Sequence, residues 1–466
     1  MQITDTFTIE EAQALLAQKK AYFFSGETRS VGFRRKKLKA LKEVIKRREQ
    51  EVFDAIYADF KKPVFETLGT EVAYVIAEID QAIKHLNDWA KPRSLNATLL
   101  NFPAREYVQP EPFGVSLIIA PWNYPFQLVF APLVAAIAAG NCAVVKPSEL
   151  TVQTSLLMES IIAEVFDPEY VSVVQGAVQT STNLLTQPWD HLFFTGSVPV
   201  GKIIMKAAAE HLIPVVLELG GKSPCIIDKT ADLKIAAHRI MWGKFLNAGQ
   251  SCVAPDYLLV HEDIKQALLE KMQLVLTKFY SNTPAESPDF ARIISDRHFD
   301  RLVSFLDDGK IVVGGEHDKA SRFIAPTILD DVQWDDAVMQ DEIFGPVLPV
   351  LTFTDLDEAI RTVNARPKPL ALYIFSEKHR IQNKVLAETS SGGSCVNDTV
   401  SHMANPDMPF GGVGTSGLGS YHGKAGFDAF SNLKAVTRRG SWLDIPLRYP
   451  PYAGKLGWIR AAFKIS

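Results

Sequence analysis

The sequence of 466 residues contains little cysteine and has no marked excess of charge of either sign. Its four cysteines form no CxxC pair and have no histidine cluster beside them, which argues against a disulfide framework or a zinc site and favours a reducing compartment. The formal net charge of -4 provides no basic surface for nucleic acid and no strongly acidic tail. We therefore predict no metal site and no nucleic-acid partner, in a chain long enough for two or three domains.

The sequence also lacks an obvious targeting or membrane-spanning segment. Its first residues carry no basic stretch followed by an apolar run, so we expect no signal peptide and predict a cytoplasmic location. The stretch 115–145 has no charged residue and would be long enough to cross a bilayer. Because Pro121, Pro125 and Pro132 interrupt it, we interpret it as strand, turn, helix and strand in a protein core.

Helical and strand patterns alternate through the middle of the chain. Thr8-Ile-Glu-Glu11 resembles a capping box at the start of a first helix, and an amphipathic pattern runs from Leu38 to Ile56. Strands are predicted at 115–119, 143–145, 171–174, 192–194 and 215–217, with helices at 128–139, 151–166 and 200–209 between them. This alternation predicts an α/β fold with a parallel, doubly wound sheet, and a second α/β series begins at 224–227. The glycine- and proline-rich stretch 406–426 and the stretch 94–112 fall outside it, and we interpret the former as an extension or hairpin arm.

Cys252 lies among small residues in the stretch 247–256, between a predicted helix and a predicted strand at 257–260. Gly249 and Ser251 allow a sharp turn and leave a backbone N–H near the sulfur. This setting suits a reactive thiolate. The alternative is a buried structural cysteine, which is the commoner role of a free cysteine.

Two glycine patterns compete as phosphate-binding turns. Gly412-Val-Gly414-Thr-Ser-Gly417 matches the dinucleotide fingerprint in its letters but lacks the preceding strand and the following helix, so we reject it. The turn from Gly196 to Lys202 lies between a strand and a helix, and fits a nucleotide-triphosphate loop except that Ile203 replaces the magnesium-binding hydroxyl. Asp228 resembles a second magnesium ligand, which keeps a P-loop hydrolase as an alternative. Without a metal, the same turn offers N–H groups to a dinucleotide pyrophosphate.

Polar side chains follow several of the predicted strands. Lys146 and Glu149 come after the strand 143–145, where they can bind a ribose. Glu218 ends the strand 215–217 and can act as a general base, and Asn123 lies in a turn where its amide can face an oxyanion. The alternatives are an ordinary surface loop, a salt-bridged glutamate and a turn asparagine.

Taken together, these stretches resemble the aldehyde dehydrogenase superfamily, and in particular its class 3 and fatty-aldehyde branch. The resemblance covers nearly the whole chain. It is carried by Pro121-Trp-Asn-Tyr-Pro125, Lys146-Pro-Ser-Glu149, Phe194-Thr-Gly-Ser197, Leu217-Glu-Leu-Gly-Gly-Lys-Ser-Pro224, Gly249-Gln-Ser-Cys252-Val-Ala-Pro255, Glu342-Ile-Phe-Gly-Pro346, Asn397-Asp-Thr399, His402-Met-Ala-Asn-Pro406 and Pro409-Phe-Gly-Gly412.

The resemblance implies a role for each matching residue. It implies Cys252 as the nucleophile, Glu218 as the base, and Asn123 with the backbone N–H of Cys252 as the oxyanion hole. It implies a cofactor, NAD or NADP, bound by Lys146, Glu149, Thr195, Gly196, Ser197, Gly201, Leu219, Glu342 and Phe344. The implied reaction is the oxidation of an aldehyde to a carboxylic acid through a cysteine thiohemiacetal and thioester.

The resemblance further implies two doubly wound, Rossmann-like domains and a small β-rich bridging arm used for oligomerisation, in a homodimer. We place the NAD(P)-binding domain at 1–90 and 110–217, the catalytic domain at 218–395, the arm at 91–109 and 396–440, and a tail at 441–466. Fatty-aldehyde relatives resemble this chain up to Arg448-Tyr-Pro-Pro-Tyr452 and then continue into an anchoring helix. The segment Leu456–Phe463 is too short to span, so we expect no transmembrane anchor, and weak contact with a membrane surface remains open.

Tyr124 and Trp242 are the candidate substrate contacts. If both line the approach to Cys252, the entrance is apolar and favours medium- or long-chain aliphatic or aromatic aldehydes; otherwise Trp242 belongs to the core. The amphipathic tail, with Trp458, Ile459 and Phe463, is a candidate cover for the tunnel mouth. A non-enzymatic dinucleotide sensor is the remaining alternative, although such a protein would not need Cys252, Glu218 and Asn123 together.

Overall fold

The computed structural model describes residues 5–96, 101–444 and 446–463. Residues 1–4, where no signal peptide is predicted, 97–100 of the predicted arm, and 445 and 464–466 of the predicted tail lie outside the described residues. Helices fill the N-terminal part: α1 (Ile9–Ser25), α2 (Val31–Arg47), α3 (Glu49–Phe60), α4 (Val64–Thr67), a π-helical turn (Leu68–Val72) and α5 (Ala73–Ala90). The capping box is confirmed, because the Glu11 N–H donates to the Thr8 hydroxyl (3.2 Å) and the Thr8 N–H donates to the Glu11 carboxylate (2.7 Å).

The amphipathic pattern from Leu38 to Ile56 is divided between two helices. Arg48 (φ −102°, ψ 18°) ends α2 and precedes α3, and its guanidinium pairs with Glu51. Leu38, Ile45 and Ile56 are all fully buried, so both helices turn their apolar faces to the same core. Hydrophobic spacing therefore identified the buried faces but not the break between the helices.

The first sheet has the strand order β17-β7-β6-β3-β4-β5, and its strands are parallel except at one edge. It is formed by β3 (Val115–Ile119), β4 (Cys142–Lys146), β5 (Val171–Val173), β6 (His191–Gly196), β7 (Val215–Leu219) and the antiparallel β17 (Gly417–Leu418). Helices α6 (Gln127–Ala139), α7 (Val152–Val165), α8 (Val178–Leu185) and α9 (Val198–Glu210) connect the parallel strands. The predicted doubly wound sheet is confirmed, whereas the short α8 was not predicted.

The uncharged stretch 115–145 forms β3, α6 and β4, as predicted. Every residue of α6 is buried, so this apolar segment is the central helix of a domain. Within the parts of the chain that the structure describes, no helix is both long and apolar enough to cross a bilayer.

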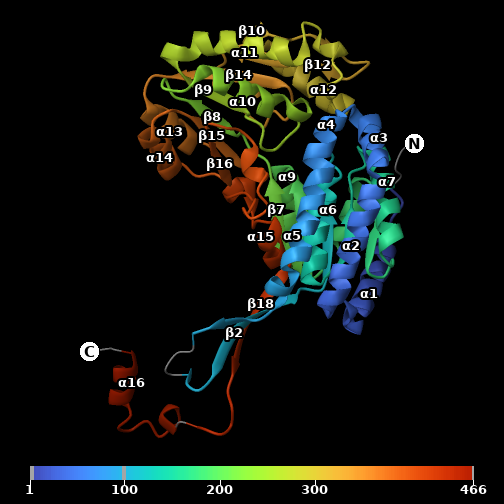
Figure 1. Cartoon of the computed structure of the whole chain (residues 1–466), viewed down its shortest axis with the longest axis vertical. Coiled ribbons are helices and arrows are strands. Elements are labelled where there is room, and N and C mark those ends of the chain that lie inside the picture. Colours follow the sequence, from blue (N-terminus) through green and yellow to red (C-terminus); the bar gives the residue numbers. More distant parts are fainter. Residues whose placement is uncertain (1–4, 97–100, 445, 464–466) are drawn as a thin grey trace.

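The second sheet has the strand order β10-β13-β14-β9-β8-β15-β16. Its strands are β8 (Pro224–Ile227), β9 (Tyr257–His261), β10 (Lys310–Val313), β13 (Thr327–Asp330), β14 (Val347–Phe353), β15 (Ala371–Phe375) and β16 (Gly393–Val396), and β10 is antiparallel to β13. It is accompanied by α10 (Leu233–Phe245), α11 (Lys265–Tyr280), α12 (Asp296–Val303), α13 (Leu356–Asn364), α14 (His379–Glu388) and the hairpin of β11 (His317–Asp318) and β12 (Phe323–Ile324). Figure 1 shows this part of the chain above the first sheet and its helices.

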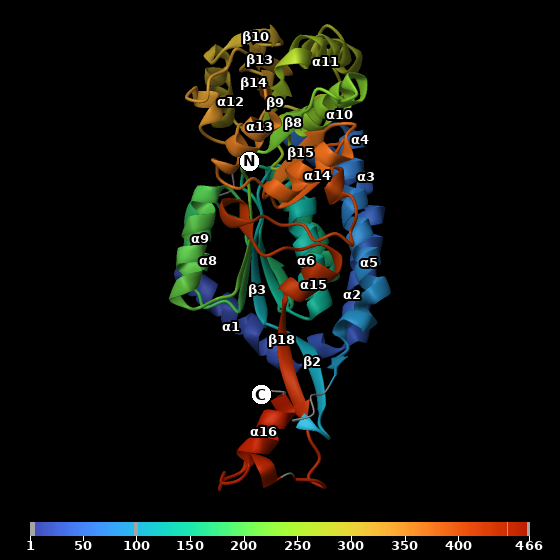
Figure 2. The same cartoon turned by 90° about the vertical axis from the view of Figure 1, so that its left-hand side faces the viewer.

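A third, antiparallel sheet joins β1 (Arg93–Leu95), β2 (Arg105–Pro112) and β18 (Ser431–Arg438). Figures 1 and 2 show it projecting away from the two larger sheets, with α16 (Leu456–Phe463) at its far end. The stretch 406–426, interpreted from sequence as an extension or hairpin arm, does not belong to this sheet. It contains β17, which pairs with β7, and leads into α15 (Gly423–Ala429), which packs against α5 and α6. An antiparallel bridge between Phe410 and Tyr421 forms a hairpin within this stretch. Its glycines allow close packing, because a Cβ at Gly412 or Gly417 would meet backbone atoms at 2.0 or 2.5 Å.

Candidate active site

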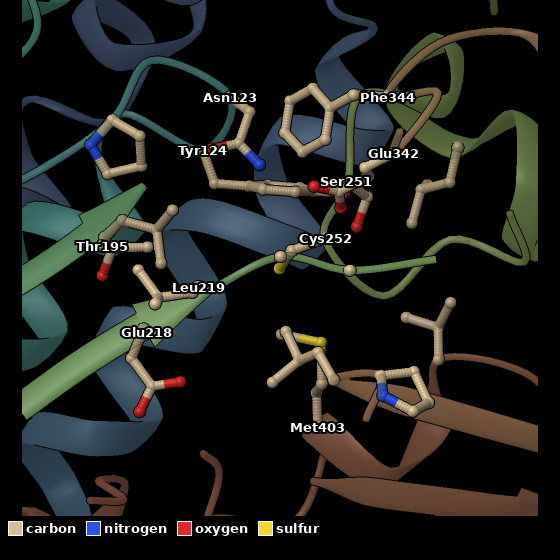
Figure 3. A pocket seen from close by; sticks show the side chains of 18 of the residues that line it. Asn123, Tyr124, Thr195, Glu218, Leu219, Ser251, Cys252, Glu342, Phe344 and Met403 are labelled. Carbon is tan, nitrogen blue, oxygen red and sulfur yellow. The ribbon is translucent and has the colours of Figure 1, made fainter. Parts of the chain in front are cut away.

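A cavity of about 1210 Å³ opens between the elements that carry the predicted site residues. Eleven of the fourteen predicted residues line it: Asn123, Tyr124, Thr195, Gly196, Ser197, Glu218, Leu219, Trp242, Cys252, Glu342 and Phe344. Figure 3 shows Cys252 in the middle of the view, Asn123 and Phe344 above it, and Glu218 and Met403 below it. The structure thus brings together residues that lie far apart in the sequence, from 123–124 to 342–344.

Lys146, Glu149 and Gly201 do not line this cavity. Lys146 is buried at the end of β4, and its ammonium lies 3.1 Å from the Glu149 carboxylate. A Cβ at Gly201 would meet the Leu219 side chain at 2.6 Å, so this glycine lets α9 approach β7 closely.

The turn before Cys252 is strained and held by several hydrogen bonds. Asn247, Ala248 and Gly249 have φ values of 55°, 52° and 74°, although the left-handed region costs a residue with a Cβ about 1–2 kcal/mol. The Asn247 N–H donates to the Glu66 carboxylate (2.9 Å), and the Gln250 amide donates to the Asn247 and Arg292 carbonyls (3.1 and 3.0 Å). Such strain at a turn beside a cavity is typical of a site whose geometry must be fixed.

Asn123 is fastened to this same turn. Its backbone carbonyl accepts a hydrogen bond from the Asn247 side-chain amide (2.8 Å), and its own side-chain amide donates to the Gln250 backbone carbonyl (3.2 Å). The side chain is buried, and in Figure 3 its amide nitrogen points towards Cys252. Since that NH₂ group has two hydrogens, one remains to face a substrate oxygen.

A buried ion pair supports the segment that carries Asn123. Lys62 and Glu71 are both fully buried, with 2.7 Å between the ammonium and the carboxylate. The other Glu71 oxygen accepts the N–H groups of Phe126 and Gln127 at 3.0 and 2.9 Å, which satisfies the start of α6. The role of Glu71 was not predicted from sequence, because nothing in its local sequence distinguishes it from a solvent-exposed helix glutamate.

The Cys252 thiol is half-buried, and burial is the main cause that raises its pKa above the ordinary value. The carboxylates of Glu342 and Glu218 raise it further, while the backbone N–H groups of Cys252 and Val253 oppose the change. The other cysteines, Cys142, Cys225 and Cys395, are more fully buried.

Glu218 is the penultimate residue of β7 and lies opposite Thr195 of β6, with 2% of its surface exposed. Burial raises its pKa well above the ordinary value, and neither carboxyl oxygen has a hydrogen-bond partner among the described residues. A buried carboxyl without partners is costly for stability, which indicates a functional reason for its position.

The Gly196 to Gly201 turn has the setting that a dinucleotide pyrophosphate requires. It joins β6 to α9, a helix of 13 residues whose N-cap, Ser197, makes no side-chain capping bond within the described structure. The first N–H groups of α9 therefore have no side-chain acceptor at the N-cap, and the N-terminus of a helix favours an anion. The residues present thus fit a dinucleotide.

The alternative triphosphate site is not supported by the structure. Asp228, the candidate second magnesium ligand, is at the end of β8 in the second sheet. Its carboxylate accepts hydrogen bonds from the hydroxyls of Thr230 (2.6 Å) and Ser376 (3.2 Å). Among the described residues, no group of three or more histidine, cysteine, aspartate and glutamate side chains is arranged to hold a metal ion.

The Glu342 to Phe344 loop closes the cavity on the side of the second sheet. Burial and the nearby Asp256 carboxylate raise the pKa of Glu342 to about 8. A Cβ at Gly220 would lie 2.0 Å from a Glu342 carboxyl oxygen, so only glycine leaves room for this side chain. Lys222 and Arg301 donate hydrogen bonds to carbonyls of the loop, and neither was identified from sequence.

The tail does not reach the cavity of its own chain. Figure 1 shows α16 beyond the third sheet, far from the site, and Trp458 and Phe463 are exposed there. The suggestion that the tail covers the tunnel mouth therefore does not hold within one chain.

Comparisons with known proteins identify the family of this chain. The model of the aldehyde dehydrogenase family matches residues 4–436. The 4,4'-diaponeurosporen-aldehyde dehydrogenase of Staphylococcus aureus is 47% identical over 447 residues, covering 96% of this chain and 97% of that protein. Aldehyde dehydrogenase family 3 member A2 of Pongo abelii is 46% identical over 442 residues, covering 94% and 90%.

Solved structures give the same result. The substrate-bound state of Staphylococcus aureus AldH superimposes with a TM-score of 0.95 at 46% identity, covering 97% of this chain and 99% of that one. An NAD-dependent aldehyde dehydrogenase from Sinorhizobium meliloti superimposes with a TM-score of 0.85 at 30% identity, covering 94% and 89%. The chain therefore belongs to the aldehyde dehydrogenase family, and its activity is the oxidation of aldehydes with a nicotinamide cofactor.

Proposed function

We propose that Cys252 attacks the aldehyde carbonyl and that the product acid leaves through a thioester on this residue. The observation that carries the proposal is the convergence of Cys252, Asn123 and Glu218 on one cavity that also reaches the turn before α9. A thiol, an amide donor and a carboxyl group are the parts that acyl transfer through cysteine needs.

Asn123 and the backbone N–H of Cys252 stabilise the oxyanion that forms when the sulfur adds to the carbonyl. The hydrogen bond between Asn247 and Asn123 keeps this donor aligned with the nucleophile turn. Because the donors are already oriented, they need little reorganisation as charge develops, and one such donor contributes about 10²–10³ in kcat.

Proton movement follows from the raised pKa values. Burial raises the pKa of both the Cys252 thiol and the Glu218 carboxyl, which favours their neutral forms in the free protein. The thiol gives up its proton to water in the cavity as the sulfur adds to the carbonyl. Admission of water to Glu218 lowers the cost of its charged form. Glu218 then takes a proton from the water that attacks the thioester, and releases the acid.

We infer that the cofactor lies along the first sheet and ends near Cys252. Lys146 and Glu149 would bind the adenosine ribose, Gly196 and Ser197 the pyrophosphate, and Glu342 and Phe344 the nicotinamide ribose and ring, with Thr195, Gly201 and Leu219 shaping the path. An oxidised nicotinamide held there would supply the hydride acceptor for the carbon attached to Cys252. Glu149 favours NAD over NADP, because its carboxylate repels a 2′-phosphate and Lys146 offsets only part of that repulsion.

We infer that the substrates are medium- or long-chain aliphatic or aromatic aldehydes. Tyr124 and Trp242 line the cavity with other apolar side chains, among them Phe65, Leu246 and Met403. Each additional buried methylene contributes up to about 0.8 kcal/mol of binding. The Staphylococcus aureus relative is named for a specific aldehyde, which supports an aldehyde substrate here without identifying it.

We also propose a homodimer that uses the third sheet as its bridging arm. The projection of β2 and β18 away from the larger sheets supports this role. In such a dimer a tail can cover the tunnel mouth only of the other copy. Light scattering during size-exclusion chromatography would measure the mass of the assembly.

The proposed function is tested by following NADH absorbance with aldehydes of increasing chain length. The wild type is expected to oxidise them with a kcat/KM that rises with length until the tunnel ends. Cys252→Ser should abolish acid formation and leave cofactor binding nearly intact. Turnover of Cys252→Ser close to that of the wild type would refute the mechanism.

A further inference from the structure

One wall of the cavity is formed by the segment 397–404, which follows β16. Val400, Ser401, Met403 and Ala404 of this segment line the cavity, and Figure 3 shows Met403 below Cys252. Asn397 and Val400 have φ values of 55° and 62°, in the left-handed region. For a β-branched residue such as Val400 this conformation is a genuine outlier, so the surrounding structure must impose it.

A cysteine–histidine pair fastens the end of this segment to β16. The Cys395 sulfur lies 3.2 Å from Nδ1 of His402. Burial raises the pKa of the Cys395 thiol and lowers that of His402 to about 4, so both groups are neutral at neutral pH. With the His402 proton assigned to Nε2, Nδ1 accepts from the thiol, and the sulfur also lies 3.6 Å from the Ser401 hydroxyl. A Cβ at Gly393 would meet the His402 ring at 2.5 Å, so the strand leaves room for this ring.

Tyr373 connects the strained residue of the wall to the nucleophile. It is fully buried on β15, directly opposite Cys395 of β16. Its hydroxyl donates to the Val253 carbonyl at 2.5 Å, and the backbone N–H of Val400 opposes the rise that burial causes in its pKa. Val253 is the residue after Cys252, so this hydroxyl joins the strand beside the 397–404 wall to the backbone next to the nucleophile.

We propose that Tyr373 and the Cys395–His402 pair are positioning residues that fix the 397–404 wall relative to Cys252 and thereby set the selectivity for long-chain aldehydes. A long chain lies against Val400 and Met403, whereas a two-carbon aldehyde does not extend along the wall. Disturbing either anchor should therefore affect long substrates more than short ones. The inference rests on the proposed role of Cys252 and on the proposed substrate class.

The test is the ratio of kcat/KM for dodecanal to kcat/KM for acetaldehyde. Cys395→Ala removes the donor, and Tyr373→Phe removes only the hydroxyl. Each should lower the ratio by about fivefold, the effect of one lost hydrogen bond. Cys395→Ser retains a donor and should restore a ratio close to the wild-type value, a rescue that a merely structural role of the side-chain volume would not produce.

Cys225→Ala is the matched control. Cys225 is buried on β8, on the other side of Tyr373, and its substitution should leave the ratio within twofold of the wild type. If Cys395→Ala does not fold, His402→Ala removes the acceptor from the cavity side and should lower the ratio in the same way.

Two results would overturn the inference, provided that the variants still oxidise acetaldehyde. One is a dodecanal-to-acetaldehyde ratio that is unchanged in both Cys395→Ala and Tyr373→Phe. The other is a ratio that falls equally in Cys395→Ser and Cys395→Ala. Absence of aldehyde oxidation by the wild type would instead refute the proposed function.

Discussion

Gly249→Ala perturbs the turn that presents the nucleophile without removing any group that takes part in chemistry. Gly249 has a φ of 74°, and a Cβ at this position would lie 2.3 Å from the Gly345 carbonyl oxygen and 3.1 Å from that of Lys244. Both atoms belong to the backbone, so the turn itself must move. The left-handed conformation alone costs alanine about 1–2 kcal/mol.

The expected effect on catalysis is larger than the effect on stability. Gly249 is three residues before Cys252, and Gly345 directly follows the Glu342 to Phe344 loop. A movement of the turn therefore displaces both Cys252 and the loop proposed to bind the nicotinamide. A misplacement of about 1 Å costs on the order of 10²-fold in rate. We therefore expect kcat to fall by about 10²-fold in Gly249→Ala.

The assay is steady-state NADH formation at saturating aldehyde, with thermal unfolding measured in parallel. Gly32→Ala is the control, because Gly32 lies in α2 and its Cβ would meet only the Ser30 hydroxyl at 3.6 Å. This helical substitution should be neutral or stabilising by about 0.5–1 kcal/mol. A kcat of Gly249→Ala within threefold of the wild type would refute the argument that this turn fixes the position of Cys252.

Three further predictions concern the base, the cofactor and the tail. Glu218→Gln should slow release of the acid by about 10²–10⁴-fold, because the amide cannot take a proton from water; rapid-quench kinetics should still show a burst of NADH, and loss of the burst would contradict this role. Glu149→Gln should raise the ratio of kcat/KM for NADP to that for NAD, and a strong wild-type preference for NADP that the variant leaves unchanged would contradict it. Because the tail can cover the tunnel mouth only of the other copy in the proposed dimer, removal of residues 454–466 should weaken selectivity for dodecanal and spare acetaldehyde. Equal losses on acetaldehyde, hexanal and dodecanal would show that the tail only stabilises the protein.

The sequence predicted the parallel strands well because each is a short apolar run. Val115–Ile119 and Pro224–Ile227 have the predicted bounds and are fully buried, as strands covered on both faces must be. The short helix α8 was missed, because five of its eight residues are polar threonine, serine, asparagine or glutamine, which gives a weak apolar pattern. The pairing of β17 with β7 is a contact across about 200 residues, which local patterns do not encode.

The candidate site was identified from sequence as a set of residues, and the structure adds how they are held. From sequence, Asn247 was only one residue of the stretch around Cys252. In the structure its side-chain amide donates to the Asn123 carbonyl and its backbone N–H donates to the Glu66 carboxylate, which ties both residues to the turn before Cys252. Glu71 and Tyr373 act through partners 55 and 120 residues away in the chain, so their spacing carries no signal. Lys146 and Glu149 were predicted together, and the structure pairs them with each other, away from the cavity that holds Cys252.

The central claim is that the reacting carbon becomes covalently attached to Cys252. The measurement is intact-mass and peptide mass spectrometry of the Glu218→Gln variant, mixed with hexanal and oxidised cofactor and quenched in acid. The account predicts an increase by one acyl group less one hydrogen, located on Cys252, absent without oxidised cofactor and absent from Cys142, Cys225 and Cys395. An acyl group on another residue, or full turnover with no adduct on Cys252 at any time, would contradict it.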